Sequence, residues 1–126
     1  MTENEIARQV VDACYKIHMD LGTGMLESAY ERVLAHELKI RGLSVQCQAP
    51  IGIIYEDLHV PGAFVADMVV EEKVIVELKS VTKVAPVHSK QLLTYLKLST
   101  MRLGLLVNFG EQYIGSGITR VVNGLS

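Results

Sequence analysis

The segment Phe64–Lys79 constrains the fold of this chain more than any other, and it reads FVADMVVEEKVIVELK. Two apolar runs rich in β-branched residues are separated by a short charged stretch, which is the pattern of a β-hairpin. Asp67 interrupts the first run, and Glu77 and Lys79 lie in the second. Because side chains alternate between the two faces of a strand, Glu77 and Lys79 project from the same face.

The length of the turn decides where Asp67 lies. A turn over residues 71–73 pairs Val70 with Val74 and sets Asp67 opposite Glu77, about 5 Å away across the strands. A turn shorter by one residue shifts the register and separates the two carboxylates. The segment has no glycine for a left-handed turn position, so the sequence supports the first register without fixing it.

Two carboxylates at that spacing repel each other unless a cation lies between them or one of them takes a proton. Their oxygen atoms suit a hard divalent ion such as Mg²⁺. Lys79 could then orient or deprotonate a water molecule, or stabilise negative charge that develops on a phosphate. The alternative is a hairpin at the edge of a sheet whose charged side chains face water, and spacing alone does not decide between the two.

The composition indicates a single domain over all 126 residues, because 49% of them are hydrophobic and no segment is of low complexity. A net charge of −2 argues against a protein that binds nucleic acid by bulk electrostatic attraction. The charge leaves open an enzyme that meets phosphate groups through a metal ion and a local basic patch.

The sequence also predicts the compartment. No apolar run approaches the ~18–20 residues of a membrane span, and the start of the chain lacks the pattern of a signal peptide, so we expect a cytoplasmic protein with no membrane partner. With only two cysteines, and no clustered histidines, neither a disulfide framework nor a zinc site is indicated. Cys14 lies on a helical apolar stripe and is predicted to be a buried core residue.

Helical periodicity predicts two helices at the start of the chain. Apolar residues recur at helical spacing over residues 6–21, and Thr2 followed by Glu5 forms a capping-box pattern. A second helix is predicted from about Met25 to Arg41, with an apolar face that includes Tyr30.

The pattern then changes to strands. Residues 43–55 alternate apolar and polar side chains with a break at Pro50, residues 58–60 form a short extended piece, and Pro61-Gly62 makes a turn before the hairpin.

Beyond the hairpin and a loop over residues 81–87, a third helix is predicted from His88 to Ser99. Residues 103–109 form a wholly apolar strand, as expected for one buried on both faces. The weak pattern of the tail, residues 113–125, fits either a strand or a helical turn. The order ααβββαβ predicts an α/β fold in which helices pack against a sheet.

Seven further side chains on the helices and loops are candidates for the same site. Glu27 begins the second helix and shares a face with Tyr30. A third carboxylate above the hairpin is one interpretation of Glu27, and simple capping of the helix start is the other. On the third helix, Gln91 could hydrogen-bond a metal-bound water or a phosphate, or could be a boundary residue.

Gln91 lies one helical turn from both His88 and Tyr95. For His88, near the helix start, the alternative is a solvated side chain or a cap. Lys83 and Lys90 flank the loop that follows the hairpin and could contact a backbone phosphate. The other basic residues are scattered along the chain and are expected to be solvated.

At this point the motifs resemble a known family. GMLESAY, at residues 24–30, matches the Gly-x-x-Glu-x-x-Tyr signature of the GxxExxY protein family. The blocks FVADMVV, VIVELKS, HSKQLLTYLKLS and RLGLLVNFG resemble the remaining blocks of that family in order and spacing, so that the resemblance covers about residues 5–110. The family is placed in the PD-(D/E)XK nuclease superfamily, which implies a restriction-endonuclease-like core: a mixed sheet flanked by helices, with a metal site on the central hairpin.

The resemblance implies roles for individual residues. Asp67 matches the first acid of the superfamily motif, and Glu77 with Lys79 matches its E-x-K half. Glu27 matches the helix carboxylate that many members add to the metal site, and Gln91 matches a polar residue on the helix after the hairpin. Ala66 stands where the motif has its proline, a position that varies widely in the superfamily.

Together these observations predict a nuclease that uses Mg²⁺ or Mn²⁺ and hydrolyses phosphodiester bonds in DNA, with RNA as the less favoured substrate. The implied metal ligands are Asp67, Glu77 and Glu27, with Lys79 and Gln91 completing the catalytic set. The implied substrate contacts are Tyr30, His88, Tyr95, Lys83 and Lys90. A non-catalytic module that keeps the fold and binds nucleic acid or protein is the alternative, and the apolar content leaves surface for a homodimer.

Overall fold

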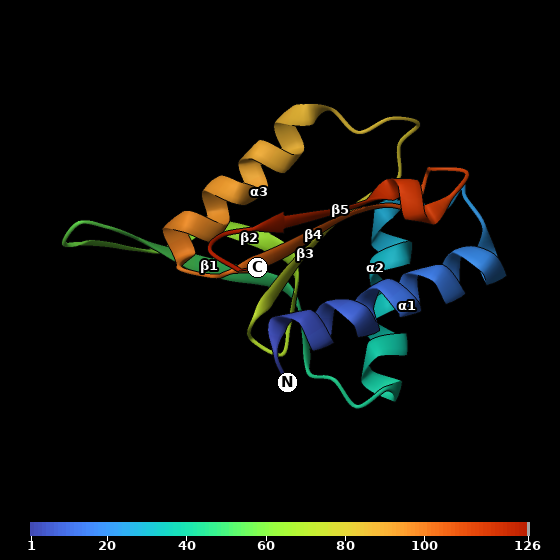
Figure 1. Cartoon of the computed structure of the whole chain (residues 1–126), viewed down its shortest axis with the longest axis horizontal. Coiled ribbons are helices and arrows are strands. Elements are labelled where there is room, and N and C mark those ends of the chain that lie inside the picture. Colours follow the sequence, from blue (N-terminus) through green and yellow to red (C-terminus); the bar gives the residue numbers. More distant parts are fainter. Residues whose placement is uncertain (126) are drawn as a thin grey trace.

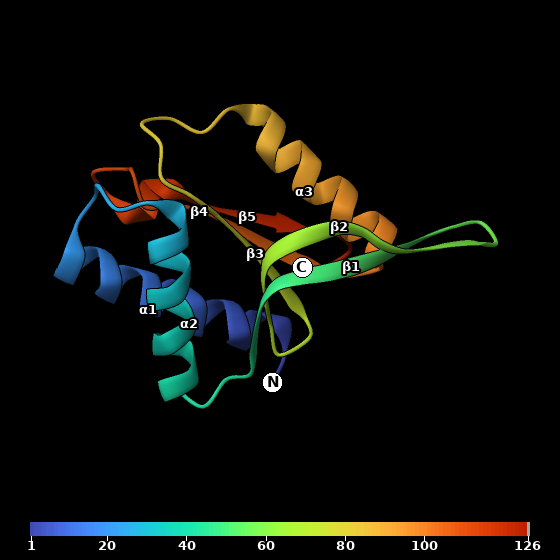
Figure 2. The same ribbon diagram turned by 180° about the vertical axis from the view of Figure 1, so that it is seen from behind.

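The computed structural model describes residues 1–125, in which a five-stranded mixed sheet carries helices on both faces (Figure 1; Figure 2). The helices are α1 (Glu3–Leu21), α2 (Glu27–Ile40) and α3 (Pro86–Ser99), with a short 3₁₀ helix η1 (Ile114–Gly117). The strands are β1 (Val45–Tyr55), β2 (Leu58–Val70), β3 (Val74–Lys79), β4 (Leu103–Asn108) and β5 (Ile118–Val122).

The strands follow one another across the sheet in the order β1-β2-β3-β4-β5. Neighbouring strands are antiparallel except β3 and β4, which are parallel because α3 crosses over between them. The predicted α/β fold with a mixed sheet is therefore confirmed, and the open question of the C-terminal tail is answered by η1 followed by β5.

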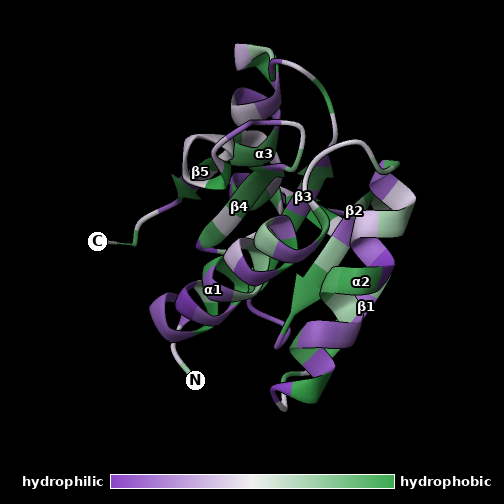
Figure 3. Ribbon diagram, turned by 90° about the vertical axis from the view of Figure 1, so that its right-hand side faces the viewer, coloured by the Kyte–Doolittle hydropathy of each residue, from purple (hydrophilic) through white to green (hydrophobic). Residues whose placement is uncertain are grey.

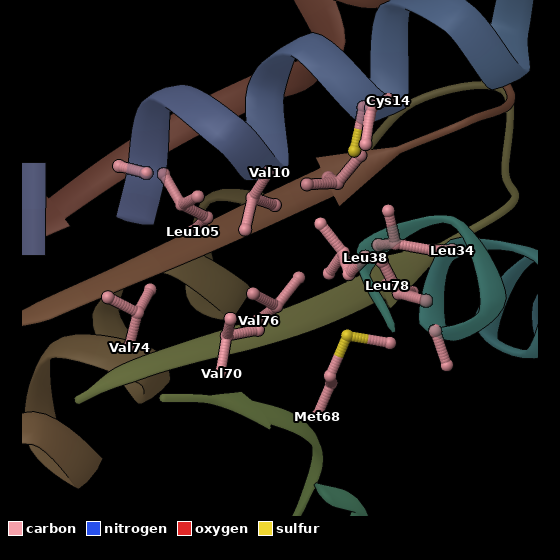
Figure 4. Packing of buried hydrophobic residues seen from close by; sticks show 14 of the residues in the cluster. Val10, Cys14, Leu34, Leu38, Met68, Val70, Val74, Val76, Leu78 and Leu105 are labelled. Atoms are coloured by element: carbon pink, nitrogen blue, oxygen red, sulfur yellow. The ribbon is translucent and has the colours of Figure 1, made fainter. Parts of the chain in front are cut away.

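Two apolar cores lie on opposite faces of the sheet. The larger core joins α1 and α2 to β2, β3 and β4, and Figure 4 shows Val10, Leu34, Val76 and Leu105 converging in it. The smaller core packs Leu92 and Leu96 of α3 onto the other face. Figure 3 shows that the ribbons of α1 and α2 alternate between hydrophilic and hydrophobic segments, as expected for helices that are solvated on one side.

The start of α1 forms as the sequence predicts. The Thr2 side chain accepts a hydrogen bond from the Glu5 backbone N–H at 3.2 Å, and the Glu5 carboxylate accepts one from the Thr2 N–H at 3.0 Å. This reciprocal pair satisfies two donors that the helix would otherwise leave unpaired. Farther along the helix, Cys14 is fully buried, as predicted, and burial raises the pKa of its thiol to about 12.

The β1–β2 hairpin differs from the prediction. Neither Pro50 nor the Pro61-Gly62 pair ends a strand: β2 runs from Leu58 to Val70, and Pro61-Gly62 lies at an irregularity in its pairing with β1. Proline is tolerated here because β1 is the edge strand of the sheet, so the missing N–H of Pro50 costs no bond to a further strand. The outer part of this hairpin projects well beyond the rest of the protein (Figure 1; Figure 2).

The turn between β2 and β3 has the predicted length, and Val70 pairs with Val74. Glu71 and Glu72 adopt left-handed backbone conformations, with φ of 53° and 58°, although neither is glycine. This strain costs roughly 1–2 kcal/mol per residue. Hydrogen bonds offset it, because the Glu71 carboxylate accepts from the Ser44 N–H at 2.9 Å and from its hydroxyl at 2.8 Å.

Within residues 1–125, no helix has the length and apolar character needed to cross a membrane.

Candidate functional site

The carboxylates of Asp67 and Glu77 lie side by side at the end of the paired part of the β2–β3 hairpin. Asp67 Oδ2 accepts a hydrogen bond from the Leu78 backbone N–H at 2.9 Å, and Glu77 Oε1 lies 3.4 Å from the Asp67 backbone N, which donates to it. The register that the sequence favoured is therefore present. Each carboxylate reaches across to the other strand, so the pair bridges β2 and β3.

Asp67 and Glu77 lie at the point where the regular backbone pairing of β2 with β3 ends. β2 and β3 pair directly from Val70 and Val74 to Met68 and Val76, and Asp67 is the next residue of β2. Beyond that point the Asp67 side chain takes the place of a backbone acceptor for the Leu78 N–H. The carboxylate is thus held by the main chain of the neighbouring strand rather than by a flexible side-chain partner.

The environment of Glu77 favours its neutral form. Burial, followed by the neighbouring Asp67 carboxylate, raises the pKa of Glu77 to about 8, and Lys79 only partly offsets this effect. Glu77 and Lys79 point to the α3 side of the sheet, where they line a small hollow of about 20 Å³. Lys79 therefore neutralises the two carboxylates less than a divalent cation would.

The far end of β3 is held by β4. The Lys79 carbonyl accepts a hydrogen bond from the Phe109 N–H at 2.9 Å. Asn108 is only 1% exposed, and its side chain accepts from the Val81 N–H at 3.1 Å and donates to the Val81 carbonyl at 2.9 Å. A side chain on Gly110 would collide with the Val81 backbone, so the close approach requires glycine there. These contacts fix the segment that carries Lys79.

Glu27 lies beside Asp67, in a different hollow from the one that Glu77 and Lys79 line. It begins α2, is exposed, and lines with Asp67 a depression of about 180 Å³. The loop before it is tied to β3, because the Ser80 hydroxyl donates to the Met25 carbonyl at 2.7 Å. The start of α2 is thereby held next to the end of β3.

Tyr30 belongs to the core and offers no surface to a substrate. Its side chain is fully buried and stacks on Phe109, with ring centroids 4.3 Å apart. Its hydroxyl donates to the Gly22 carbonyl at 2.6 Å and accepts from the Met25 N–H at 3.3 Å. The structure therefore corrects the expectation that Tyr30 contacts the substrate, and shows instead that it fixes the loop that precedes Glu27.

The predicted residues of α3 gather on the opposite side of the hairpin. His88, Gln91 and Tyr95 line the same small hollow as Glu77 and Lys79. The Tyr95 ring stacks on Phe64 of β2, with centroids 3.8 Å apart, which seats α3 against the strand next to the site.

A sequence model of the PD-(D/E)XK nuclease superfamily matches residues 4–121. The protein belongs to this superfamily. Comparison with curated proteins and comparison with solved structures gave no match. Superfamily membership supports a nuclease-like function with a nucleic acid substrate, and nucleases of this superfamily typically use divalent metal ions.

Within the described part of the chain, the acids are not gathered into one group. Among residues 1–125, no set of three or more His, Cys, Asp or Glu side chains lies close enough together to hold a metal ion. The Asp67–Glu77 pair nevertheless fits a hard cation, because its donors are carboxylate oxygens; burial, and after it the neighbouring Asp67 carboxylate, raises the pKa of Glu77. Glu27 lines the same depression as Asp67 but is not part of a compact set with the pair.

Lys83 and Lys90 are exposed and outside the two hollows described so far. Lys83 lines a separate depression of about 240 Å³ that also contains Asn108 and Ser89.

Three side chains near the site are not among those that the sequence patterns predicted. Asn108 lies in a strand that was interpreted as wholly apolar, and a polar residue in such a run is the signal that could have revealed it. Glu31 is four residues after Glu27 on α2 and lines the same depression, so helical spacing could have found it. Gln48, the third, lies opposite Asp67 on β1 and had no distinguishing sequence signal.

Proposed function

We propose that the protein is a metal-dependent nuclease that hydrolyses phosphodiester bonds in DNA, with RNA as the less favoured substrate. The observation that carries the proposal is the side-by-side arrangement of the Asp67 and Glu77 carboxylates, with Lys79 two residues along the same strand, in a member of a nuclease superfamily.

In this proposal Asp67 and Glu77 hold a Mg²⁺ or Mn²⁺ ion, and Glu27 completes the ligand set directly or through a water molecule. When bound, the ion would polarise a phosphoryl oxygen and lower the pKa of a bound water. Glu77 would bind the ion as a carboxylate, and the positive charge of the ion would offset the repulsion between Glu77 and Asp67.

The remaining groups act on the water and on the substrate. Lys79 orients or deprotonates the attacking water, and Gln91 hydrogen-bonds either that water or the scissile phosphate. His88 and Tyr95 line the hollow beside Lys79, where they would contact the nucleotide that flanks the cut. Lys83 and Lys90 would attract the backbone phosphates from the exposed surface around α3.

The proposal is tested with labelled single- and double-stranded DNA and RNA in the presence of Mg²⁺, Mn²⁺ or EDTA. Asp67→Asn and Lys79→Ala should each lower the cleavage rate by about 10²–10⁴-fold, since each removes a group that acts on the reacting atoms. Lys73→Ala is the matched control, because Lys73 is an exposed lysine in the turn of the same hairpin. Cleavage that persists in both site variants would identify a contaminating enzyme and overturn the proposal.

The competing proposal is a non-catalytic module that retains the fold and binds nucleic acid or protein. It is favoured by the separation of Glu27 from the Asp67–Glu77 pair. Melting in the presence and absence of Mn²⁺ distinguishes the two proposals. A melting temperature that rises with Mn²⁺ in the wild type but not in Asp67→Asn supports the metal site, and no rise in either supports the module.

A further inference from the structure

Gln48 breaks the regularity of β1 directly opposite Asp67. Cys47 pairs with Met68 on one side and Ala49 pairs with Ala66 on the other, but the intervening pair, Gln48 with Asp67, is missing from the ladder. The backbone of Gln48 is left-handed, with φ of 49°. Within residues 1–125 it is the one non-glycine residue inside a strand with this conformation, since the others lie in turns or at a helix end: Glu56, Glu71, Glu72 and Thr100.

The irregularity rotates the strand pair. Residues two apart on a strand normally share a face of the sheet. Met68 packs in the core under α1 and α2, whereas Ala66 packs in the core under α3. The change of face therefore happens at Asp67. It coincides with the point where the Asp67 carboxylate leaves the regular pattern and accepts the hydrogen bond from Leu78.

A side-chain contact anchors the irregular residue to α2. The Gln48 amide donates a hydrogen bond to Glu31 Oε1 at 2.7 Å, and both residues line the depression that also contains Glu27 and Asp67. A left-handed residue costs about 1–3 kcal/mol and persists only where the surrounding structure enforces it. Gln48 is exposed, so burial does not enforce this conformation, and the contact with Glu31 links it to the helix that presents Glu27.

We infer that Gln48 is a positioning residue, whose left-handed backbone aims the Asp67 carboxylate at β3 and whose amide holds the start of α2 beside it. The inference rests on the proposed function for its catalytic meaning, because Asp67 is there a metal ligand. The geometric part, that Gln48 sets the Asp67–Leu78 hydrogen bond, stands without any metal.

The experiment compares three substitutions of Gln48 that separate backbone from side chain. Gly keeps the left-handed conformation and removes the amide, Asn tolerates the conformation with a shorter amide, and Val opposes the conformation because it is β-branched. Gln46→Val is the matched control, since Gln46 is an exposed glutamine two residues earlier on β1 that pairs regularly with Val69.

The first measurement needs no metal ion. Hydrogen exchange of the Leu78 amide reports its bond to Asp67, with Asp67→Ala as the reference in which the bond is absent. Gln48→Val should lose at least about 10-fold in protection of this amide at constant overall stability, because strain from a wrong φ displaces its opposite residue. Gln48→Gly, Gln48→Asn and Gln46→Val should retain the protection. Unchanged protection in a folded Gln48→Val variant would overturn the inference.

The second measurement connects the geometry to the site. Mn²⁺ affinity, kcat and KM are determined for the same variants. Gln48→Val should weaken Mn²⁺ binding at least about 10-fold and lower kcat with little change in KM, whereas Gln48→Gly, which loses only the amide contact with Glu31, should weaken Mn²⁺ binding by a smaller factor. Mn²⁺ binding by Gln48→Val equal to that of Gln46→Val would contradict the inference. A wild-type protein that binds no Mn²⁺ would refute the proposed function alone, because the exchange measurement then still decides the role of Gln48.

Discussion

The two halves of β2 differ in burial and in strand pairing. From Met68 to Val70 the strand lies between β1 and β3, is buried on both faces, and pairs regularly on both sides. From Leu58 to Val65 it pairs only with β1 and forms the projecting arm, and Leu58 and Val65 are 61% and 55% exposed. Asp67 lies at the junction of these two halves.

The contrast shows how the surroundings of the Asp67 carboxylate differ from those of either half. A side chain in the inner half would be enclosed by the two cores, and one in the outer half would have no rigid neighbour to fix its direction. At the junction, β3 holds Asp67 through the Leu78 N–H while the depression beside α2 leaves room for a ligand. Rigid support on one side and free space on the other are what a preorganised site requires.

The largest stability effect should separate the two halves directly. Met68 is fully buried among residues of α2 and β3 (Figure 4), so Met68→Ala should lower the free energy of unfolding by about 2–5 kcal/mol through lost burial and a residual cavity. Val65→Ala, in the outer half, should lower it by less than about 0.5 kcal/mol. Urea denaturation of both variants measures the difference. Equal effects would show that the arm is packed in solution.

The comparison extends to β3, whose last residues have no partner on β2 and depend on β4. Asn108→Ala leaves the polar groups of Val81 unpaired, so we expect a loss of about 1–3 kcal/mol in unfolding free energy and slower cleavage, because the segment carrying Lys79 loosens. Denaturation and cleavage assays measure the two effects.

Asn123→Ala is the matched control for this variant. The Asn123 side chain donates to the Met101 carbonyl at 2.9 Å, away from the site. Asn123→Ala should lower stability and leave the cleavage rate unchanged. A cleavage rate that falls equally in both variants would mean that Asn108 acts only through stability.

A smaller effect concerns pH at the junction itself. Burial and Asp67 raise the pKa of Glu77 to about 8, above its ordinary value of 4.5, so the folded protein binds more protons than the unfolded chain between these values. The unfolding free energy should therefore fall as pH rises from 4.5 to 8. Glu77→Gln removes this loss and should be more stable than the wild type by at least about 1 kcal/mol at pH 8–9 in EDTA, with no advantage near pH 4.

Melting temperatures across this pH range measure the effect. Glu72→Gln, in the exposed turn, is the control and should follow the wild type. A Glu77→Gln variant that gains nothing at high pH would show that Glu77 is more solvated in solution, or farther from Asp67, than in the structure. Adding Mn²⁺ should restore the wild type at high pH and leave Glu77→Gln unchanged.

The smallest effect is expected at the end of the arm. Tyr55 is 54% exposed next to the β1–β2 turn, so Tyr55→Ser should change the unfolding free energy by no more than about 0.5 kcal/mol. Thermal denaturation at two protein concentrations measures it. A larger loss that depends on concentration would show that the arm is covered by a second molecule.

Local sequence signals predicted the elements whose causes are local. The Thr2–Glu5 capping box, the turn that pairs Val70 with Val74, and the buried β4 all depend on neighbouring residues or on a continuous pattern. The continuity of β2 through Pro61-Gly62 was not predictable in this way, because it depends on pairing with β1, which resumes on both sides of an irregularity at Pro61-Gly62.

The same distinction applies to the candidate site. Spacing alone placed Glu77 and Lys79 on one face, and the turn length placed Asp67 opposite Glu77. The interior position of Tyr30 depends on Phe109, which is far away in the sequence, and the left-handed backbone of Gln48 depends on the sheet and on α2. Such long-range causes leave no mark in a local pattern.

The two cysteines differ in their surroundings, so their reaction with a thiol reagent can report on unfolding of the protein. Cys14 is inaccessible and its thiol has a pKa near 12, whereas Cys47 is exposed on β1. A thiol reagent should therefore label Cys47 in the native protein and reach Cys14 only when α1 separates from the sheet. The rate of the second labelling event measures how often the larger core opens, without any engineered probe.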